Sequence, residues 1–151
     1  MPLFIDNADL DKIYTANAMG GWKFEFGART VIDGCEYIFV KYNDGDGNVP
    51  AVAGGLGYIV GTATTGVYQW ETTMDFDSAT VVALLQAVAG IYQAALTNGT
   101  GGWVQISGYG RKALTTDGNV TAGVRLMAGS ANGTVVLHDA GANADIGVAL
   151  E

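Results

Sequence analysis

Tight-turn dipeptides between short apolar segments constrain the fold of this chain more than any other feature. The 151 residues include 23 glycines and 2 prolines, and Asp or Asn precedes Gly at six points: Asp33-Gly34, Asp44-Gly45, Asp46-Gly47, Asn98-Gly99, Asp117-Gly118 and Asn132-Gly133. Such pairs readily adopt the backbone angles of tight hairpin turns. From Gly102 to Leu150, short apolar runs end at five turn signals: Ser107-Gly108, Asp117-Gly118, Gly129-Ser130, Asn132-Gly133 and Asp139-Ala140-Gly141. We therefore expect a mainly β chain, a small barrel or sandwich of short hairpins.

Hydrophobic periodicity places the expected elements. The residues Trp22–Phe26 alternate between aromatic and charged side chains, as in a half-buried strand. Further strands are predicted around the turn signals: 29–33 with 36–41, 58–60, 67–74, and 91–96 with 102–106. Segment 77–89 has apolar residues at helical spacing after Asp77 and Ser78, which are both good helix caps. One short helix is predicted there.

The N-terminal residues differ in composition from the rest of the chain. An apolar cluster, Pro2–Ile5, precedes an acidic stretch, Asp6–Asp11, and a flexible joint, Asn17–Gly21. A segment of this kind is expected to become ordered against its own domain or a neighbouring subunit. The chain length suits one core. We therefore predict an extended N-terminal arm, residues 1–21, and a single β-rich domain, residues 22–151.

The charge of the chain excludes some partners. Fifteen acidic and seven basic residues give a net charge of −8, whereas nucleic-acid binding needs a basic surface for phosphates. Charged residues make up 15% of the chain, below the usual value of about 25%, which favours self-association or docking on a larger body. No apolar run reaches the roughly 18 residues of a membrane helix, and the N-terminus does not resemble a secretion signal. We predict no nucleic acid, no membrane and synthesis in a cytoplasm.

Residues that carry enzyme chemistry are scarce. Cys35 is the single cysteine and His138 the single histidine, and they fall in different predicted hairpins. Ser107 lacks the glycine two positions earlier that a nucleophile elbow requires. A carboxylate pair stays open: Glu71 with Asp75 or Asp77. We predict no catalytic residue and no cofactor.

The acidic loop 43–48 invites a calcium interpretation because Asp44, Asp46 and Asn48 offer oxygen ligands. The position at which an EF-hand places a bidentate Glu is Gly55, counted from Asp44. That pattern therefore fails. A solvated hairpin tip is the preferred interpretation, and no metal site is predicted.

Three sequence runs resemble the head decoration (cement) proteins of tailed bacteriophages. They are Ala89–Gly108, which ends in Gly-Gly-Trp-Val-Gln-Ile-Ser-Gly, Asp117–Leu126 and Ile146–Leu150. The hairpin around Asp33-Gly34 also looks like the first hairpin of such virion proteins. The resemblance covers most of the chain apart from the arm. In one departure, Val124-Arg125 stands where an acidic residue is common.

The resemblance implies a non-enzymatic structural protein on the outer capsid surface of a virion, made in the cytoplasm of a host bacterium. It implies binding to the major capsid protein, commonly as a homotrimer at local threefold sites, and stabilisation of the shell against the pressure of DNA. We expect the capsid or subunit interface to use apolar and aromatic side chains: Pro2, Leu3, Phe4, Ile5, Trp22 and Trp103.

Other functions stay open from the sequence. Trp22, Trp70 and Trp103, with seven tyrosines, could form a carbohydrate platform of a head-surface adhesin. Core or subunit packing is the more usual use of such residues in a β protein. The remaining alternatives are a self-assembling subunit of a shell or tail tube, and a small hydrolase.

Overall fold

The computed structural model describes residues 8–60, 70–75, 88–109, 113–114, 122, 125–129, 131–137 and 146–148. Within these residues the chain is mainly β, as predicted, and has nine strands and no helix. The strands are β1 (Arg29–Ile32), β2 (Cys35–Tyr42), β3 (Leu56–Ile59), β4 (Glu71–Thr73), β5 (Val88–Tyr92), β6 (Gly101–Ser107), β7 (Arg125–Ala128), β8 (Val135–Leu137) and β9 (Gly147–Val148). The last two residues of the predicted helix begin β5, and the rest of it lies outside the described residues.

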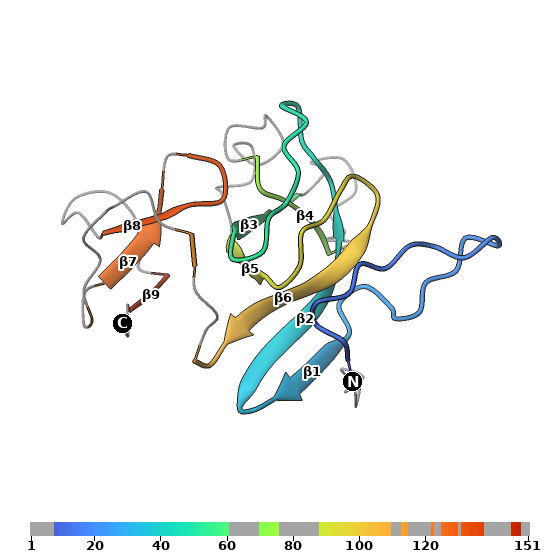
Figure 1. Ribbon diagram of the computed structural model, residues 1–151, viewed down its shortest axis with the longest axis horizontal. Helices are drawn as coiled ribbons and strands as arrows, with labels where there is room; N and C mark the ends of the chain where they lie inside the picture. Colours follow the sequence, from blue (N-terminus) through green and yellow to red (C-terminus); the bar gives the residue numbers. More distant parts are fainter. Residues whose placement is uncertain are drawn as a thin grey trace.

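Five strands close into a β-barrel. Around the ring, β2 pairs in parallel with β4, and β4, β3, β5 and β6 follow in antiparallel pairs. The long strands β2 and β6 pair antiparallel and complete the circle, as Figure 1 shows. β1 pairs with the first half of β2. Of the predicted alternatives, barrel or sandwich, the structure forms the barrel.

Strand β2 is buried on both faces, which explains its continuous apolar run. Ile38, Val40 and Tyr42 point into the barrel core. The alternate residues Tyr37 and Phe39 pack on the outer side, beneath the N-terminal part of the chain. Since successive side chains of a strand point to opposite faces, this run supplies two separate cores at once.

The barrel end beside Tyr42 is filled by the loop 43–55. The Tyr42 hydroxyl donates a hydrogen bond to the Val49 carbonyl and accepts one from the Met74 N–H at 3.3 Å. Ala51 and Leu96 exchange two backbone hydrogen bonds, at 2.9 and 3.2 Å. Burial raises the pKa of Tyr42 to about 12. The phenol is therefore neutral in the folded protein and closes this end of the barrel.

A three-stranded antiparallel sheet, in the order β8-β7-β9, lies beside the barrel (Figure 1). The Leu56 N–H donates to the Gly133 carbonyl at 2.8 Å, and the Val135 N–H donates to the Leu114 carbonyl at 2.8 Å. The Val135 side chain packs with Leu56 and Tyr58 of the barrel. This second sheet is therefore attached to the outside of the barrel through β3.

Two predicted strand pairings are confirmed. β1 and β2 form a hairpin in which Ile32 faces Cys35 across Asp33-Gly34, and both turn residues have positive φ, +52° and +77°. β5 and β6 also pair, with Ile91 opposite Gln105. These are the positions at which turn chemistry and apolar runs coincide in the sequence.

Candidate interaction surface

The N-terminal segment, residues 8–28, covers the outer face of β2 and β6. Ala8, Tyr14 and Ala28 are buried there. The Tyr14 N–H donates to the Gly101 carbonyl at 2.9 Å, and the Gly101 N–H donates back to the Tyr14 carbonyl at 2.8 Å. The described part of the predicted arm is therefore fixed to the start of β6, at Gly101, the first residue of the Gly-Gly-Trp-Val-Gln motif.

An aromatic cluster joins this segment to the barrel. Its members are Tyr14, Trp22, Phe24, Phe26, Phe39 and Trp103. Phe39 stacks on Phe26 with ring centroids 5.5 Å apart and meets Tyr14 edge-on at 5.4 Å. Such ring pairs each contribute about 0.5–1.5 kcal/mol beyond their buried area. The cluster therefore anchors a stretch of chain that has few backbone hydrogen bonds to the barrel.

The strand predicted at Trp22–Phe26 is wrong, although its alternation is real. The aromatic side chains of this run face the cluster, and Lys23 and Glu25 are exposed. The backbone turns instead of following β2, because the Ala28 N–H bonds back to the Glu25 carbonyl at 3.0 Å and Gly27 has φ +88°. The packing of aromatic side chains, and not strand pairing, therefore holds Trp22–Phe26 against the barrel.

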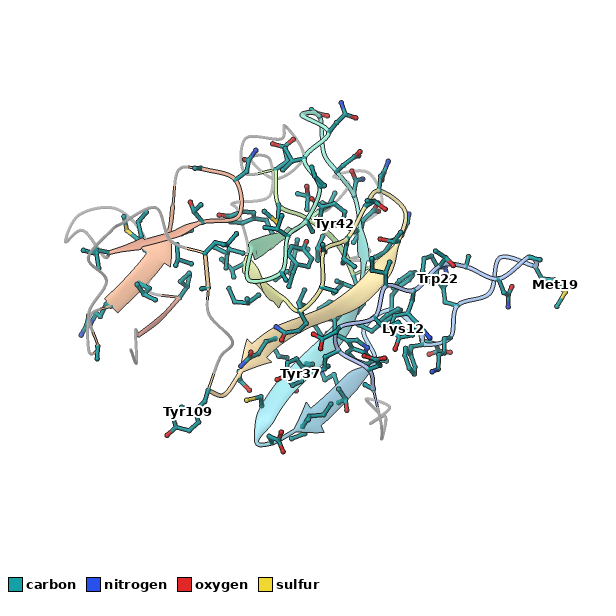
Figure 2. The ribbon with its side chains drawn as sticks, in the orientation of Figure 1. Lys12, Met19, Trp22, Tyr37, Tyr42 and Tyr109 are labelled. Carbon is teal, nitrogen blue, oxygen red and sulfur yellow. The ribbon has the colours of Figure 1, made fainter. Side chains whose placement is uncertain are left out.

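The two described residues of the predicted interface differ in exposure. Trp103 is 0% exposed, and the centre of its ring lies 5.3 Å from that of Phe24 and 5.3 Å from that of Phe39. In this fold it presents no surface to a partner. Trp22 is half-buried and lies where the N-terminal segment meets the barrel (Figure 2). Pro2, Leu3, Phe4 and Ile5 lie outside the described residues.

Residues 12–23 leave the barrel as a loop, named here the projecting loop (Figures 1 and 2). Its tip is ordered by Asn17, whose side-chain oxygen accepts hydrogen bonds from the Met19 N–H at 3.0 Å and the Gly21 N–H at 2.9 Å. The Asn17 N–H also donates to the Gly21 carbonyl at 2.7 Å. Met19 is 94% exposed at this tip. The loop thus presents an apolar side chain on an ordered turn.

Two lysines stand at the base of the projecting loop. Lys12 Nζ lies 5.8 Å from the centre of the Tyr14 ring, and Lys23 Nζ lies 5.7 Å from the same ring and 5.2 Å from that of Phe24. Cation–π contacts of this kind contribute about 0.5–1 kcal/mol at exposed sites. They also hold positive charge at a fixed position beside the loop.

The two glycines of the Gly-Gly-Trp-Val-Gln motif, Gly101 and Gly102, allow neighbouring side chains to pack closely against β6. A Cβ on Gly101 would lie 2.8 Å from the Phe39 ring and 2.9 Å from that of Trp22, and one on Gly102 would lie 2.7 Å from Leu96. Larger residues would push the aromatic cluster and the barrel core away from β6. The motif therefore has a structural explanation within this chain.

The acidic loop 43–48 is built around a buried carboxylate. Asp75 is buried, and its Oδ2 accepts a hydrogen bond from the Gly47 N–H at 2.8 Å. The Gly45 N–H donates to the Asn43 side-chain oxygen at 2.9 Å. Among the residues that the structure describes, no three His, Cys, Asp or Glu side chains form a group that could hold a metal ion.

The structure holds a half-open cavity of about 310 Å³. Residues of β1, β2, β3, β5 and β6 line it, together with Trp70 and Ile146, and the polar side chains on it are Arg29 and Gln105. Arg29 pairs with Glu36 at 2.6 Å. The cavity is therefore mainly apolar, and its one described cation already has a partner.

Among the described residues, the candidates Cys35 and Glu71 each contact groups other than another candidate. Cys35 is buried, and its thiol lies 3.0 Å from the Tyr109 carbonyl. Glu71 pairs with Lys41 at 3.5 Å and accepts a hydrogen bond from Asn43. Two further candidates, His138 and Asp77, lie outside the described residues.

Sequence reasoning missed the projecting loop as a surface feature. The signal was present: Asn17 followed by Gly20-Gly21 is a turn signature, and it lies between two lysines without an intervening acid. The composition of Asn17–Gly21 predicts a flexible joint, whereas the structure has an ordered turn there.

Comparison of the chain with protein-family models, curated proteins and solved structures finds no match in any of the three. Within the described ranges, no helix has the length and hydropathy needed to cross a bilayer.

Proposed function

We propose that this chain is a structural protein that binds the outer surface of a bacteriophage capsid and stabilises the shell. The observation that carries the proposal is the position of the Gly-Gly-Trp-Val-Gln motif. Its residues Gly101 and Trp103 hold the N-terminal segment against the barrel. The sequence run that resembles decoration proteins therefore fixes the direction in which the N-terminal segment leaves a closed body.

The proposed attachment combines a stable barrel with an apolar N-terminal extension. Pro2–Ile5 would contact the major capsid protein or the adjacent protomer, and Trp22 would contribute to the same interface. Strand addition to an exposed sheet edge is one way in which such an extension binds. Repetition of weak contacts over a homotrimer and a lattice gives firm attachment without one tight site.

Co-sedimentation with empty shells tests the proposal. The shells are assembled from the major capsid protein encoded beside this chain, in both immature and expanded forms. We expect saturable binding at a fixed ratio to the capsid subunit. Absence of binding to both forms would overturn the proposal. Sedimentation of the chain alone tests the tube- or shell-forming alternative, because a self-assembling subunit would pellet without shells.

A truncation tests the role of the N-terminus. Deletion of residues 1–7 removes Pro2–Ile5 and keeps every contact that the structure describes. We expect this variant to remain folded and to lose shell binding. A matched variant keeps the chain length but replaces Leu3, Phe4 and Ile5 with serine, and it should behave in the same way. Unchanged binding by both variants would exclude the N-terminus as the contact.

The glycan-binding alternative has weaker support. Trp103 is fully buried, and Trp22 and Trp70 are half-buried. Within the described part of the chain, Tyr109 is the one aromatic residue that is largely exposed, at 81%. A carbohydrate platform generally stacks sugars on exposed rings, so capsid binding is the preferred proposal.

A further inference from the structure

The half-open cavity has the size and the lining of a small-molecule site. Its volume of about 310 Å³ falls at the lower end of the roughly 300–1,000 Å³ that is usual for ligand pockets. Five aliphatic side chains of its lining are not fully buried: Ile59, Val88, Ile91, Ile106 and Ile146. Removal of such surface from water is favourable, so the cavity favours an apolar occupant.

The charge around the cavity disfavours an ionic occupant. Arg29 is the one charged side chain among the lining residues that the structure describes. Its Nη1 lies 2.6 Å from Glu36 Oε1, so its charge is already balanced. The net charge of the chain, −8, disfavours an anion further. A charged molecule would lose its hydration here without gaining an ionic partner, whereas an uncharged molecule would not.

Trp70 is held at the cavity wall through both its backbone and its ring. It has φ +52°, a left-handed conformation that is strained for any residue other than glycine. The Lys41 N–H donates to the Trp70 carbonyl at 3.0 Å. The indole lies so close to Gly27 that a Cβ there would be 2.2 Å from Trp70 Nε1. These contacts maintain the strain and place a large aromatic side chain beside the cavity, and strained residues of this kind are common at ligand sites.

We propose that this cavity binds an uncharged small molecule of the fused-ring aromatic class, which packs against Trp70. Contact between aromatic rings adds to the gain from burial. The position of Trp70 is fixed before the ligand arrives, so binding loses little conformational entropy at this wall. The inference concerns the barrel and does not rest on capsid binding.

Titration of the full chain with N-phenyl-1-naphthylamine, an uncharged dye whose fluorescence rises in apolar surroundings, tests this site. We expect saturable binding of a single dye to each chain. The related dye 1-anilinonaphthalene-8-sulfonate has the same rings and an added sulfonate. We expect it to bind at least about tenfold more weakly, because Arg29 is already paired. Absence of saturable binding of the uncharged dye, or equal or tighter binding of the sulfonate, would overturn the proposal.

Variants of Trp70 test whether the dye occupies this cavity. Trp70→Gly removes the indole from a backbone conformation that glycine adopts without strain. It should weaken binding of the uncharged dye at least about tenfold, because it removes both apolar area and a ring contact. Trp70→Phe keeps an aromatic ring and should bind within about threefold of the wild type. Circular dichroism of each variant verifies folding.

Matched surface variants complete the test. Val88→Glu places a carboxylate at the cavity wall and should weaken binding at least about threefold. Val31→Glu, at an exposed valine outside the cavity lining, should leave binding unchanged. Tyr109→Ser removes the most exposed aromatic ring of the described residues and should also leave binding unchanged. Loss of binding in Tyr109→Ser, or wild-type affinity in both Trp70→Gly and Val88→Glu, would exclude this cavity as the site.

Discussion

The closed barrel and the second sheet differ in how their strand edges and their apolar side chains are covered. The barrel pairs β2 with both β4 and β6, so its ring has no free edge, and closure protects strands from pairing with other chains. The second sheet has only short strands and two outer strands, β8 and β9. Its buried residue Val135 packs on Leu56 and Tyr58 of the barrel. The barrel thus contains its own core, whereas the described part of the second sheet shares one with its neighbour.

The largest expected effect comes from the aromatic cluster. Phe39→Ala removes a fully buried ring that contacts both the N-terminal segment and β6, and it should cost about 3–5 kcal/mol of unfolding free energy. Urea denaturation measures this loss. Val31→Ala, at a residue that is 55% exposed on β1, should cost less than about 0.5 kcal/mol. Equal losses in the two variants would show that the cluster does not stabilise the barrel.

Closure of the barrel is tested next. Gly90 has φ +143°, and a Cβ there would lie 2.3 Å from the Gln105 carbonyl oxygen. Gly90→Ala should therefore separate β5 from β6 and cost about 3 kcal/mol. Gly99→Ala is the matched control, because Gly99 has φ +76° but no atom within 4 Å of the added Cβ. It should cost about 1 kcal/mol, and thermal unfolding distinguishes the two.

The dependence of the second sheet on the barrel predicts a local effect. Val135→Ala should cost roughly 2 kcal/mol and speed amide hydrogen exchange in β7 and β8. Amides of β2 and β6 should keep their protection, because closure does not depend on the second sheet. Faster exchange throughout the barrel would show that the two parts unfold as one unit.

The smallest expected effect concerns pH. Burial raises the pKa of Tyr58 to about 12, and its contribution to stability is complete below pH 10 and lost as the pH rises towards 12. At pH 11 this loss is about 1.4 kcal/mol. Tyr58→Phe should therefore lose less stability than the wild type between pH 9 and pH 11. Parallel loss in both proteins would exclude Tyr58 as the titrating group.

Local features of the fold were predictable, and long-range features were not. The Asp33-Gly34 hairpin follows from turn chemistry and the apolar run beside it. Pairing of β2 with β4 and β6 was not predicted, because alternation of side chains does not specify which distant strand is the neighbour. Trp22–Phe26 shows the limit of periodicity, since a period of two occurs there without a strand.

The candidate interface was predictable only in part. Trp103 was expected at the interface because it is large and aromatic, yet the glycines beside it allow Phe39 and Leu96 to approach β6 and enclose it in the fold. The exposure of Met19 depends on the turn that Asn17 stabilises. The apolar composition of a segment does not by itself predict which of its side chains are exposed. Burial of an aromatic residue is set by the elements that surround it in space.

Pairing of β2 with β6 has a consequence for the order of events during synthesis. Strand β2 ends at Tyr42, whereas β6 begins at Gly101. Strand β2 therefore leaves the ribosome long before β6 has been synthesised. Until Gly101–Ser107 is made, Phe39 and the other apolar residues of β2 lack that covering strand. Formation of contacts between such distant segments is slow because closing a long loop costs entropy. The nascent chain therefore passes through a period in which chaperones have an exposed apolar strand to bind.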